Sequence, residues 1–396
     1  MPTGILRDSY SGLISGVSWL ICKAGVLYEF GAQRPYTESK PVSIEEVELE
    51  QPRAGEVLVR VAGAGICHSD LAVITGKRRI PMPLVLGHEC SGTVEEVGEG
   101  TQATKRGDHV VISYVPSCGK CVYCVSGVPA LCDLGRTANR KGLLLAGGTR
   151  FRLKGKELYH HLGVSAFSEY TVVSETSVIP VRKDIPIEKL ALFGCAVLVG
   201  IGSVIISAQL RAGSTVAVFG CGGVGLNVIQ GAKLAGAKEI IAVDVVESKL
   251  AMAKSLGAKE TVNSSKSDAV EEVRKLTGGI GVDYSFEAVG NTKVMAQAFR
   301  STKKKGETIL VGVTSPEDQL TIPSSMLVDE ERKIIGSYMG SVIPSRDIPM
   351  LIDLYASGRI KLDELVTRYV KLGEINECFE ALANGEVARQ VIKFDA

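Results

Sequence analysis

Residues 220–225 read GCGGVG and separate two segments of different character. The preceding segment, STVAVFG, is apolar and rich in β-branched residues, as is typical of a buried strand. The following segment, LNVIQGAKLAG, has the apolar spacing of a helix. Between them, Gly220 permits a tight turn, Gly222 leaves the backbone open, and Gly225 lets the helix lie close to the strand. The pattern predicts the first unit of a parallel sheet with crossover helices.

The alternation of strands and helices continues to about residue 340. EIIAVDV, GVDYSFEAV and TILVGV are the further strand candidates, and helical segments separate them. We therefore expect residues 197–340 to form a doubly wound parallel-sheet domain of the Rossmann type.

The glycine turn and the acid that follows it predict a dinucleotide site. A helix N-terminus behind such a turn binds a pyrophosphate. The candidate pyrophosphate contacts are Gly220, Gly222, Gly223 and Gly225. Asp244 ends the next strand, where a carboxylate accepts hydrogen bonds from the adenosine ribose and repels a 2′-phosphate. NAD is therefore expected rather than NADP, and Lys249 is a second candidate contact to the adenosine. The alternative is that Asp244 only caps the next helix.

The rest of the chain reads as a β-rich domain that the Rossmann domain interrupts. Residues 24–114 show short alternating runs broken by Gly, Pro and Asp, which predict strands. Two helical segments and a strand follow residue 340. The class is therefore α/β, with the β-rich domain at 24–196 and 341–396. Residues 1–23 are interpreted as an N-terminal extension, with a mitochondrial presequence or a signal peptide as alternatives.

Charge and hydropathy exclude several classes of partner. The net charge is +1 and no long basic block is present, so neither nucleic acid nor an anionic membrane is an expected partner. No apolar run reaches the roughly 20 residues of a membrane span. The ten cysteines are unevenly spaced, which favours a reducing compartment with metal sites over a secreted disulfide scaffold. We expect a cytoplasmic protein, or a mitochondrial one if residues 1–23 are a presequence.

The run CGKCVYCVSGVPALC predicts a structural zinc site. Four thiolates at such spacing suit a closed tetrahedral zinc that holds an irregular lobe together. They are Cys118, Cys121, Cys124 and Cys132. An iron–sulfur cluster and two disulfides are the less favoured alternatives.

A second zinc site is predicted from residues that lie far apart in the sequence. A catalytic zinc has three protein ligands and one open position. The candidates are Cys67 in GICHSDLAVITG, His88 in LVLGHECSGTVEEVGEG and Cys195 in LFGCAVLVG. A cysteine in an apolar segment is also typical of a core, so Cys195 alone is ambiguous.

Several motifs together resemble a known family. GHECSGTVEEVGEG followed by GDHVV, the cysteine cluster, FGCAVL and GCGGVG are similar, in order and spacing, to those of the zinc-dependent medium-chain alcohol dehydrogenases. The resemblance covers residues 24–396, and the segment from Asp133 to Ser165 resembles the long-chain branch of animal and plant enzymes. It implies a GroES-like core in the β-rich domain, a Rossmann domain, two zinc ions per chain and NAD.

The resemblance also implies roles at the catalytic metal. Cys67, His88 and Cys195 would bind the zinc. Asp70 would hydrogen-bond His88 and fix its tautomer. Glu89 would lie behind the metal, and Ser69 would take the proton of a bound alcohol.

Cofactor and substrate contacts follow from the same resemblance. His68 and Arg389 would contact the cofactor pyrophosphate. The substrate pocket would be lined by Tyr114, His161 and Leu162.

The implied reaction is the reversible oxidation of a primary or secondary alcohol to an aldehyde or ketone. NAD would accept hydride from an alkoxide that the catalytic zinc holds. Ala72 stands where the family has a histidine of the proton relay, and Val199 replaces a threonine near the nicotinamide. Neither change removes a ligand, so we expect an active enzyme whose proton transfer relies on water.

Three alternatives rank below a general alcohol dehydrogenase. Arg136 resembles an arginine of the S-hydroxymethylglutathione dehydrogenases, but Arg78 replaces their acid. Ala72 and Val199 suggest a catalytically silent zinc protein that binds dinucleotide. A zinc-free quinone reductase of the same superfamily would need none of the ligands. The resemblance also implies a homodimer, paired through strands within Glu307–Gly340, with a tetramer as the alternative.

Overall fold

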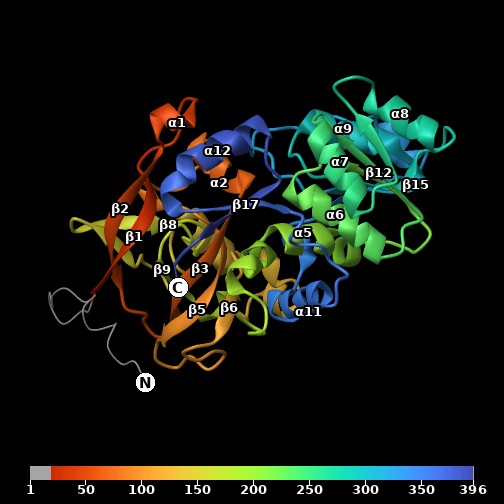
Figure 1. The fold of residues 1–396 in the computed structure, drawn as a ribbon. Helices are drawn as coiled ribbons and strands as arrows, with labels where there is room; N and C mark the ends of the chain where they lie inside the picture. The colour runs from red at the N-terminus through yellow and green to blue at the C-terminus, as the bar shows by residue number, and fades with distance from the viewer. Residues whose placement is uncertain (1–18, 396) are drawn as a thin grey trace. The chain divides into compact units, whose positions relative to one another are not determined.

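The computed structural model describes residues 19–395, and the chain divides into two compact units (Figure 1). The first unit holds the described residues up to Cys195 together with Ile343–Ala356 and the chain from Leu362 onward. The second holds Ala196–Val342 and Ser357–Lys361. The sequence predicts the corresponding boundaries after residues 196 and 340.

The N-terminal extension predicted for residues 1–23 is too long at its C-terminal end. Residues 19–23 belong to strand β1 (Trp19–Leu27), which pairs along its whole length with β2 (Val42–Glu50). Leu20 and Cys22 are buried in the core beneath these strands, so the strand begins with the alternation in WLICK. Residues 1–18 lie outside the described part of the chain.

A closed barrel in the first unit has the strand order β1-β2-β7-β8-β4. The three strands not yet given are β4 (Leu84–Val85), β7 (Phe151–Leu153) and β8 (Lys156–His160). Leu49, Phe151 and Leu158 are among the residues that fill its interior. Strand β8 ends directly before His161 and Leu162, so the barrel positions these two pocket candidates.

A second sheet of the first unit carries two candidate metal ligands, Cys67 and His88, at its strand ends. Its order is β10-β6-β5-β3-β18-β17, and β9 also pairs with β3. The strands are β3 (Glu56–Ile66), β5 (Glu89–Val97), β6 (His109–Ile112), β9 (Tyr170–Ser174), β10 (Val178–Val181), β17 (Val366–Val370) and β18 (Arg389–Lys393). Because β18 pairs with β3, the last segment of the chain lies beside the strand that leads into Cys67.

The helices of the first unit are mostly short. They are α1 (Tyr36–Ser39), α2 (His68–Ile74), α3 (Val122–Val125), α4 (Asp133–Arg140), α11 (Pro344–Ala356) and α12 (Ile375–Asn384). Helical turns of the 3₁₀ type are η1 (Pro129–Leu131), η2 (Glu175–Ser177), η3 (Ile187–Gly194) and η6 (Leu372–Glu374). Helix α12 packs against α1 and α2.

The second unit is built on a parallel sheet of order β13-β12-β11-β14-β15-β16. Its strands are β11 (Thr215–Phe219), β12 (Glu239–Asp244), β13 (Glu260–Asn263), β14 (Val282–Glu287), β15 (Thr302–Leu310) and β16 (Lys333–Gly336). Its helical segments are α5 (Ala196–Gly202), η4 (Ser203–Ser207), α6 (Gly223–Leu234), α7 (Glu247–Leu256), α8 (Ala269–Leu276), α9 (Thr292–Ser301), α10 (Ser324–Val328) and η5 (Met339–Ser341). The strand order reverses at β11, where sheets of this kind bind ligands.

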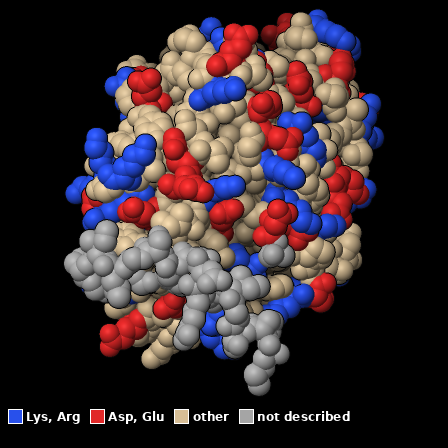
Figure 2. All heavy atoms as spheres, turned by 60° about the vertical axis from the view of Figure 1, so that its left-hand side comes forward, with Lys and Arg blue, Asp and Glu red and all other residues tan. Residues whose placement is uncertain are grey.

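The surface of the protein shows no concentration of one charge on the face in Figure 2, where basic and acidic side chains are interspersed. Within residues 19–395, no single helix is long and apolar enough to cross a membrane. In the same part of the chain, one bent pair of helices, η3 with the segment Ala196–Ser207, reaches that length and hydropathy.

Candidate active site and metal centres

The junction of β3 and α2 places Cys67 and Asp70 on one side of a helix start. Cys67 has extended backbone angles and forms the N-cap of α2. Asp70, three residues on, accepts a hydrogen bond from the Cys67 backbone N–H at 2.9 Å, which completes a capping box. The capping box fixes the Cys67 sulfur and the Asp70 carboxylate relative to each other.

Two further segments of the first unit bring the other candidate ligands to this junction. His88 directly precedes β5, and Cys195 directly follows η3. Donor atoms of Cys67, His88, Glu89 and Cys195 lie within 4.8 Å of one another, and all four residues are buried. The three predicted ligands of a catalytic zinc thus meet at one point.

Asp70 lies behind His88 and contacts two histidines. His88 Nδ1 is 2.8 Å from Asp70 Oδ1, and His161 Nδ1 is 3.1 Å from the same oxygen. Burial acts to raise the pKa of Asp70, but the imidazoles of His88 and His161 hold it below its usual value. Since Nδ1 of His88 faces this carboxylate, its Nε2 is left to bind a metal.

The charges of the buried cluster fit a divalent cation. A hydrogen bond from Cys195 holds the pKa of the Cys67 thiol well below its usual value, with help from the charge of Arg389 and against the effect of burial. The same hydrogen bond and burial raise the pKa of Cys195. With both thiols ionised and His88 neutral, as metal ligands are, Cys67, Cys195 and Asp70 would carry three negative charges against one positive charge at Arg389. A divalent ion balances the difference, and two sulfurs with one imidazole suit zinc.

Glu89 is enclosed between Gly65 and Arg389. Burial raises the pKa of Glu89 to about 8, although the charge of Arg389 opposes this. Arg389 Nη1 lies 3.2 Å from Glu89 Oε1 and donates to the carbonyl of Ile66 at 3.2 Å. Gly65 is opposite Glu89 across the strand pair, and a Cβ at position 65 would lie 2.1 Å from Glu89 Oε2. The glycine therefore makes room for the carboxylate.

Two of the three predicted pocket residues have rings against His88, and the third, Leu162, follows His161 in the chain. The rings of Tyr114 and His161 both meet the His88 ring edge-on, at centroid distances of 5.6 and 5.4 Å. Leu162 is buried and has a φ of 53°. The sequence does not predict the contact of His161 with Asp70, because 91 residues separate them and no local pattern links them.

The remaining residues near the catalytic site differ in exposure. In α2, His68 is exposed while Ser69 and Ala72 are half-buried. Arg389 is buried beside Glu89, with only 4% of its surface exposed.

The four cysteines of the irregular lobe fit a tetrahedral zinc. The sulfurs of Cys118, Cys121, Cys124 and Cys132 lie within 4.8 Å of one another, and all ten cysteines of the chain are free thiols. The Cys118–Cys124 and Cys121–Cys124 sulfur distances are 4.0 and 3.5 Å. Zinc–sulfur bonds of about 2.3 Å in a tetrahedron place sulfurs about 3.8 Å apart. The N–H of Cys124 is the main cause that lowers the pKa of Cys121 to about 6, which favours a thiolate.

The glycine turn of the second unit has the geometry of a phosphate site. Gly220 has a φ of 93°, and a Cβ on Gly225 would lie 1.7 Å from the Gly220 carbonyl oxygen. A Cβ on Gly222 would meet nothing within 4 Å, so the backbone is open there, and Gly223 begins α6. The tight turn at Gly220 and the open backbone at Gly222 agree with a site that a pyrophosphate approaches.

Asp244 ends β12 and makes two kinds of contact. One oxygen accepts from the Cys221 N–H of the glycine turn at 2.7 Å. The other accepts from the N–H groups of Val245 and Val246 at 2.8 and 3.0 Å. The carboxylate thus connects the turn to the start of α7, and Lys249 is half-buried in that helix.

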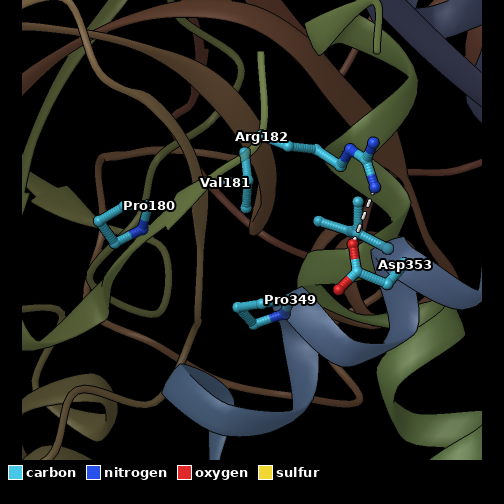
Figure 3. A pocket seen from close by; sticks show the side chains of 6 residues that line it. Pro180, Val181, Arg182, Pro349 and Asp353 are labelled. Atoms are coloured by element: carbon cyan, nitrogen blue, oxygen red, sulfur yellow. Dashed lines mark hydrogen bonds and ion pairs between the residues drawn. The ribbon is translucent and has the colours of Figure 1, made fainter. Parts of the chain in front are cut away.

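A shallow hollow of about 260 Å³ lies elsewhere on the first unit, between β10 and α11 (Figure 3). Its polar side chains, Arg182 and Asp353, form an ion pair of 2.9 Å. Its other lining residues are apolar: Pro180, Val181, Pro349 and Ile352. The hollow shares no residue with the metal sites.

Comparisons with known proteins agree with this geometry. Residues 53–183 match the model of the alcohol dehydrogenase GroES-like domain, and residues 223–357 match that of the zinc-binding dehydrogenases. An alcohol dehydrogenase zinc-binding domain protein from Burkholderia ambifaria is 36% identical, with a TM-score of 0.89 over 96% of this chain and 100% of that one. Benzyl alcohol dehydrogenase from Acinetobacter calcoaceticus is 33% identical, with a TM-score of 0.88 over 95% and 99%.

A third solved structure, from Sinorhizobium meliloti 1021, is bound to NADP and is 25% identical, with a TM-score of 0.77 over 94% of this chain and 99% of that one. The predicted α/β fold, with a GroES-like domain and a Rossmann domain, is confirmed. The chain belongs to the zinc-dependent medium-chain alcohol dehydrogenase family and is an oxidoreductase.

Proposed function

We propose that the protein oxidises a primary or secondary alcohol reversibly to an aldehyde or ketone, with NAD as the hydride acceptor. Cys67, His88 and Cys195 would hold a catalytic zinc, and the four-cysteine lobe would hold a structural one. The observation that carries the proposal is the convergence of these three buried donors with Asp70 behind His88.

When bound, zinc lowers the pKa of a coordinated hydroxyl group towards neutrality, and the nicotinamide accepts hydride. The chain's own residues prepare this step. Asp70 orients His88 through Nδ1, and the charge of Arg389 favours ionised thiols at Cys67 and Cys195.

Proton removal is assigned to Ser69, which follows Cys67 by two residues and is half-buried. Its hydroxyl would accept the alcohol's proton and pass it to water, because Ala72 offers no acceptor where the family has a histidine. His68 and Arg389 would bind the cofactor pyrophosphate, and Glu89 would lie behind the metal.

The test combines metal analysis with turnover. Purified protein is expected to contain two zinc ions per chain and to form NADH with a panel of alcohols. Cys67→Ser should lose the catalytic zinc and turnover, whereas Cys378→Ser, a buried cysteine outside both clusters, should keep both. Tight NADH binding without turnover would instead identify a catalytically silent dinucleotide-binding protein. Turnover only with S-hydroxymethylglutathione would identify that dehydrogenase.

The preference for NAD is proposed to depend on Asp244 and on the exposed Val245 beside it. Replacing both, as Asp244→Gly with Val245→Arg, removes the carboxylate and offers a cation to a 2′-phosphate. Hydrogen bonds to a charged group contribute about 1.5–3 kcal/mol, so the ratio of kcat/KM for NAD over NADP should fall about 10- to 100-fold or more. Val245→Ala is the matched control, and an unchanged ratio in the double variant would refute this assignment.

A further inference from the structure

The Asp70 carboxylate lies beside two imidazoles, and neither nitrogen of one of them, His161, makes an aligned hydrogen bond within the described chain. His88 Nδ1 and His161 Nδ1 lie 2.8 and 3.1 Å from the same oxygen of Asp70. His161 is fully buried, and its Nε2 has no hydrogen-bond partner among the described residues. Buried polar atoms of native proteins are nearly all satisfied, so such an atom points to a ligand or a water molecule.

Asp70 determines which nitrogen of His161 carries the proton. An ionised carboxylate only accepts hydrogen bonds, so the proton of the uncharged ring belongs on Nδ1, where the 3.1 Å contact is short but bent. The ring is fully buried, and burial disfavours a charged imidazole. Nε2 therefore offers a lone pair and accepts a hydrogen bond.

Ring contacts place this acceptor beside the candidate catalytic metal site. The His161 ring meets the His88 ring at a centroid distance of 5.4 Å and an angle of 75°. Because both Nδ1 atoms face Asp70 Oδ1, both Nε2 atoms are turned away from it. Nε2 of His88 is the atom left for the metal, and the ring contact places the His161 imidazole in the same buried region.

The backbone around His161 is held by several contacts. The His161 N–H donates to the hydroxyl of Ser165 at 3.1 Å and to the carbonyl of Val85 at 3.2 Å. The same hydroxyl lies 3.2 Å from His160 Nδ1. Leu162 and Ser165 both have a φ of 53°, which side-chain-bearing residues adopt only at an energetic cost. Strain of this kind persists where a ligand site requires a fixed geometry.

We propose that His161 is a specificity-determining residue whose Nε2 accepts a hydrogen bond from a second hydroxyl group of the substrate. The inference rests on the proposed function, because the reacting hydroxyl must be held at Cys67, His88 and Cys195. The second hydroxyl belongs on the neighbouring carbon, since the two imidazoles are in contact. The protein thus favours vicinal diols over alcohols that lack the second group, which leave Nε2 unpaired.

The test compares kcat/KM for 1,2-propanediol with that for 1-propanol, with 1,3-propanediol as a control for the position of the second hydroxyl. One neutral hydrogen bond corresponds to about a tenfold preference for the vicinal diol in the unmodified protein. His161→Asn keeps an N–H near the place of Nδ1 but has no atom at Nε2, so the preference should disappear. His161→Gln places an amide near Nε2 and should retain part of it.

Zinc content is measured for each variant, because an indirect structural effect on His88 would lower zinc content and kcat with all three alcohols alike. Equal kcat/KM values for 1,2-propanediol and 1-propanol in the unmodified protein would overturn the proposal. A preference for 1,2-propanediol that persists in His161→Asn would overturn it as well. Turnover of 1-propanol in either case leaves the proposed function standing. Absence of turnover with the whole alcohol panel would overturn the proposed function and this inference with it.

Discussion

At the scale of single residues, Asp70 organises the catalytic centre. Its buried carboxylate faces three donors, which are the Cys67 backbone N–H, His88 Nδ1 and His161 Nδ1. A carboxylate surrounded in this way stays ionised despite its burial. It therefore both orients His88 and increases the basicity of the nitrogen that would bind the metal.

Asp70→Asn should weaken the catalytic zinc site and leave the four-cysteine site unchanged. The amide has no charge, and its nitrogen cannot accept a hydrogen bond, so either Cys67 N–H or the histidines lose their partner. Losing a partner of this kind lowers metal affinity about 10- to 100-fold. Competition with a chelator measures it, and Asp184→Asn, in an exposed pair with Arg182, is the control. Equal affinities in both variants would contradict the role given to Asp70.

His160 should make the fold sensitive to acid. Burial, and secondly the charge of Arg150, lower its pKa to about 3 from an ordinary 6.5. The unfolded chain thus binds more protons between these values, and stability falls as the pH decreases through this window. From pH 7 to pH 4.5 the expected loss is about 2.5 kcal/mol. Urea unfolding across this range should give a flatter profile for His160→Gln; parallel profiles would exclude this histidine as the cause.

The pairing of Asp70 with His88 can be predicted from the sequence, whereas the contact of His161 with Asp70 cannot. Asp70 and His88 stand in motifs with recognisable spacing, so their pairing can be predicted. His161 reaches Asp70 only because β8 closes a barrel through pairing with β4 and β7. That closure depends on contacts between distant segments, which no local pattern records.

At the scale of elements, strong alternation predicts strands well and weak alternation does not. DHVVIS corresponds to β6 and RQVIKF to β18 within a few residues. The pattern VTRYV gives no signal for β17, because three of its five residues are exposed, and the strand forms by pairing with β18. Residues 115–166 show no sustained alternation, yet they contain the short strands β7 and β8.

The cysteine lobe should depend on its metal rather than on a core. Val122 and Val125 of α3 are 63% and 70% exposed, and no residue of that helix is buried. Cys121→Ser removes one of four ligands, so we expect one zinc ion per chain instead of two. Limited proteolysis should then cleave within residues 115–135, and Cys90→Ser serves as a control outside the cluster. A protected lobe with one zinc would show that the thiolates are dispensable for folding.

At the scale of the whole molecule, β16 leaves one side of the parallel sheet unpaired within the described chain. Such an edge is a template for pairing with another copy. Ile334 and Ile335 on this strand are only half-buried. We therefore propose a homodimer formed through the second unit.

The dimer would have a mass of about 84 kDa, twice the 42.0 kDa of the chain. Ile335→Lys places a charge on the edge strand and should shift the protein to the monomer, because a lysine opposes edge pairing. Ile280→Lys, at a position that is 66% exposed, is the control. Light scattering during size exclusion measures both, and an unmodified protein that elutes as a monomer would end this proposal.

Gly65 shows how a position without a functional group can be as restricted as a ligand. A β-carbon there would lie 2.1 Å from Oε2 of Glu89, whose Oε1 is 3.2 Å from Arg389, and the side chain would have to shift. A saturation library should therefore tolerate only glycine at position 65. A mutational screen for catalytic side chains would therefore identify Gly65, although this residue contributes only space for the Glu89 side chain.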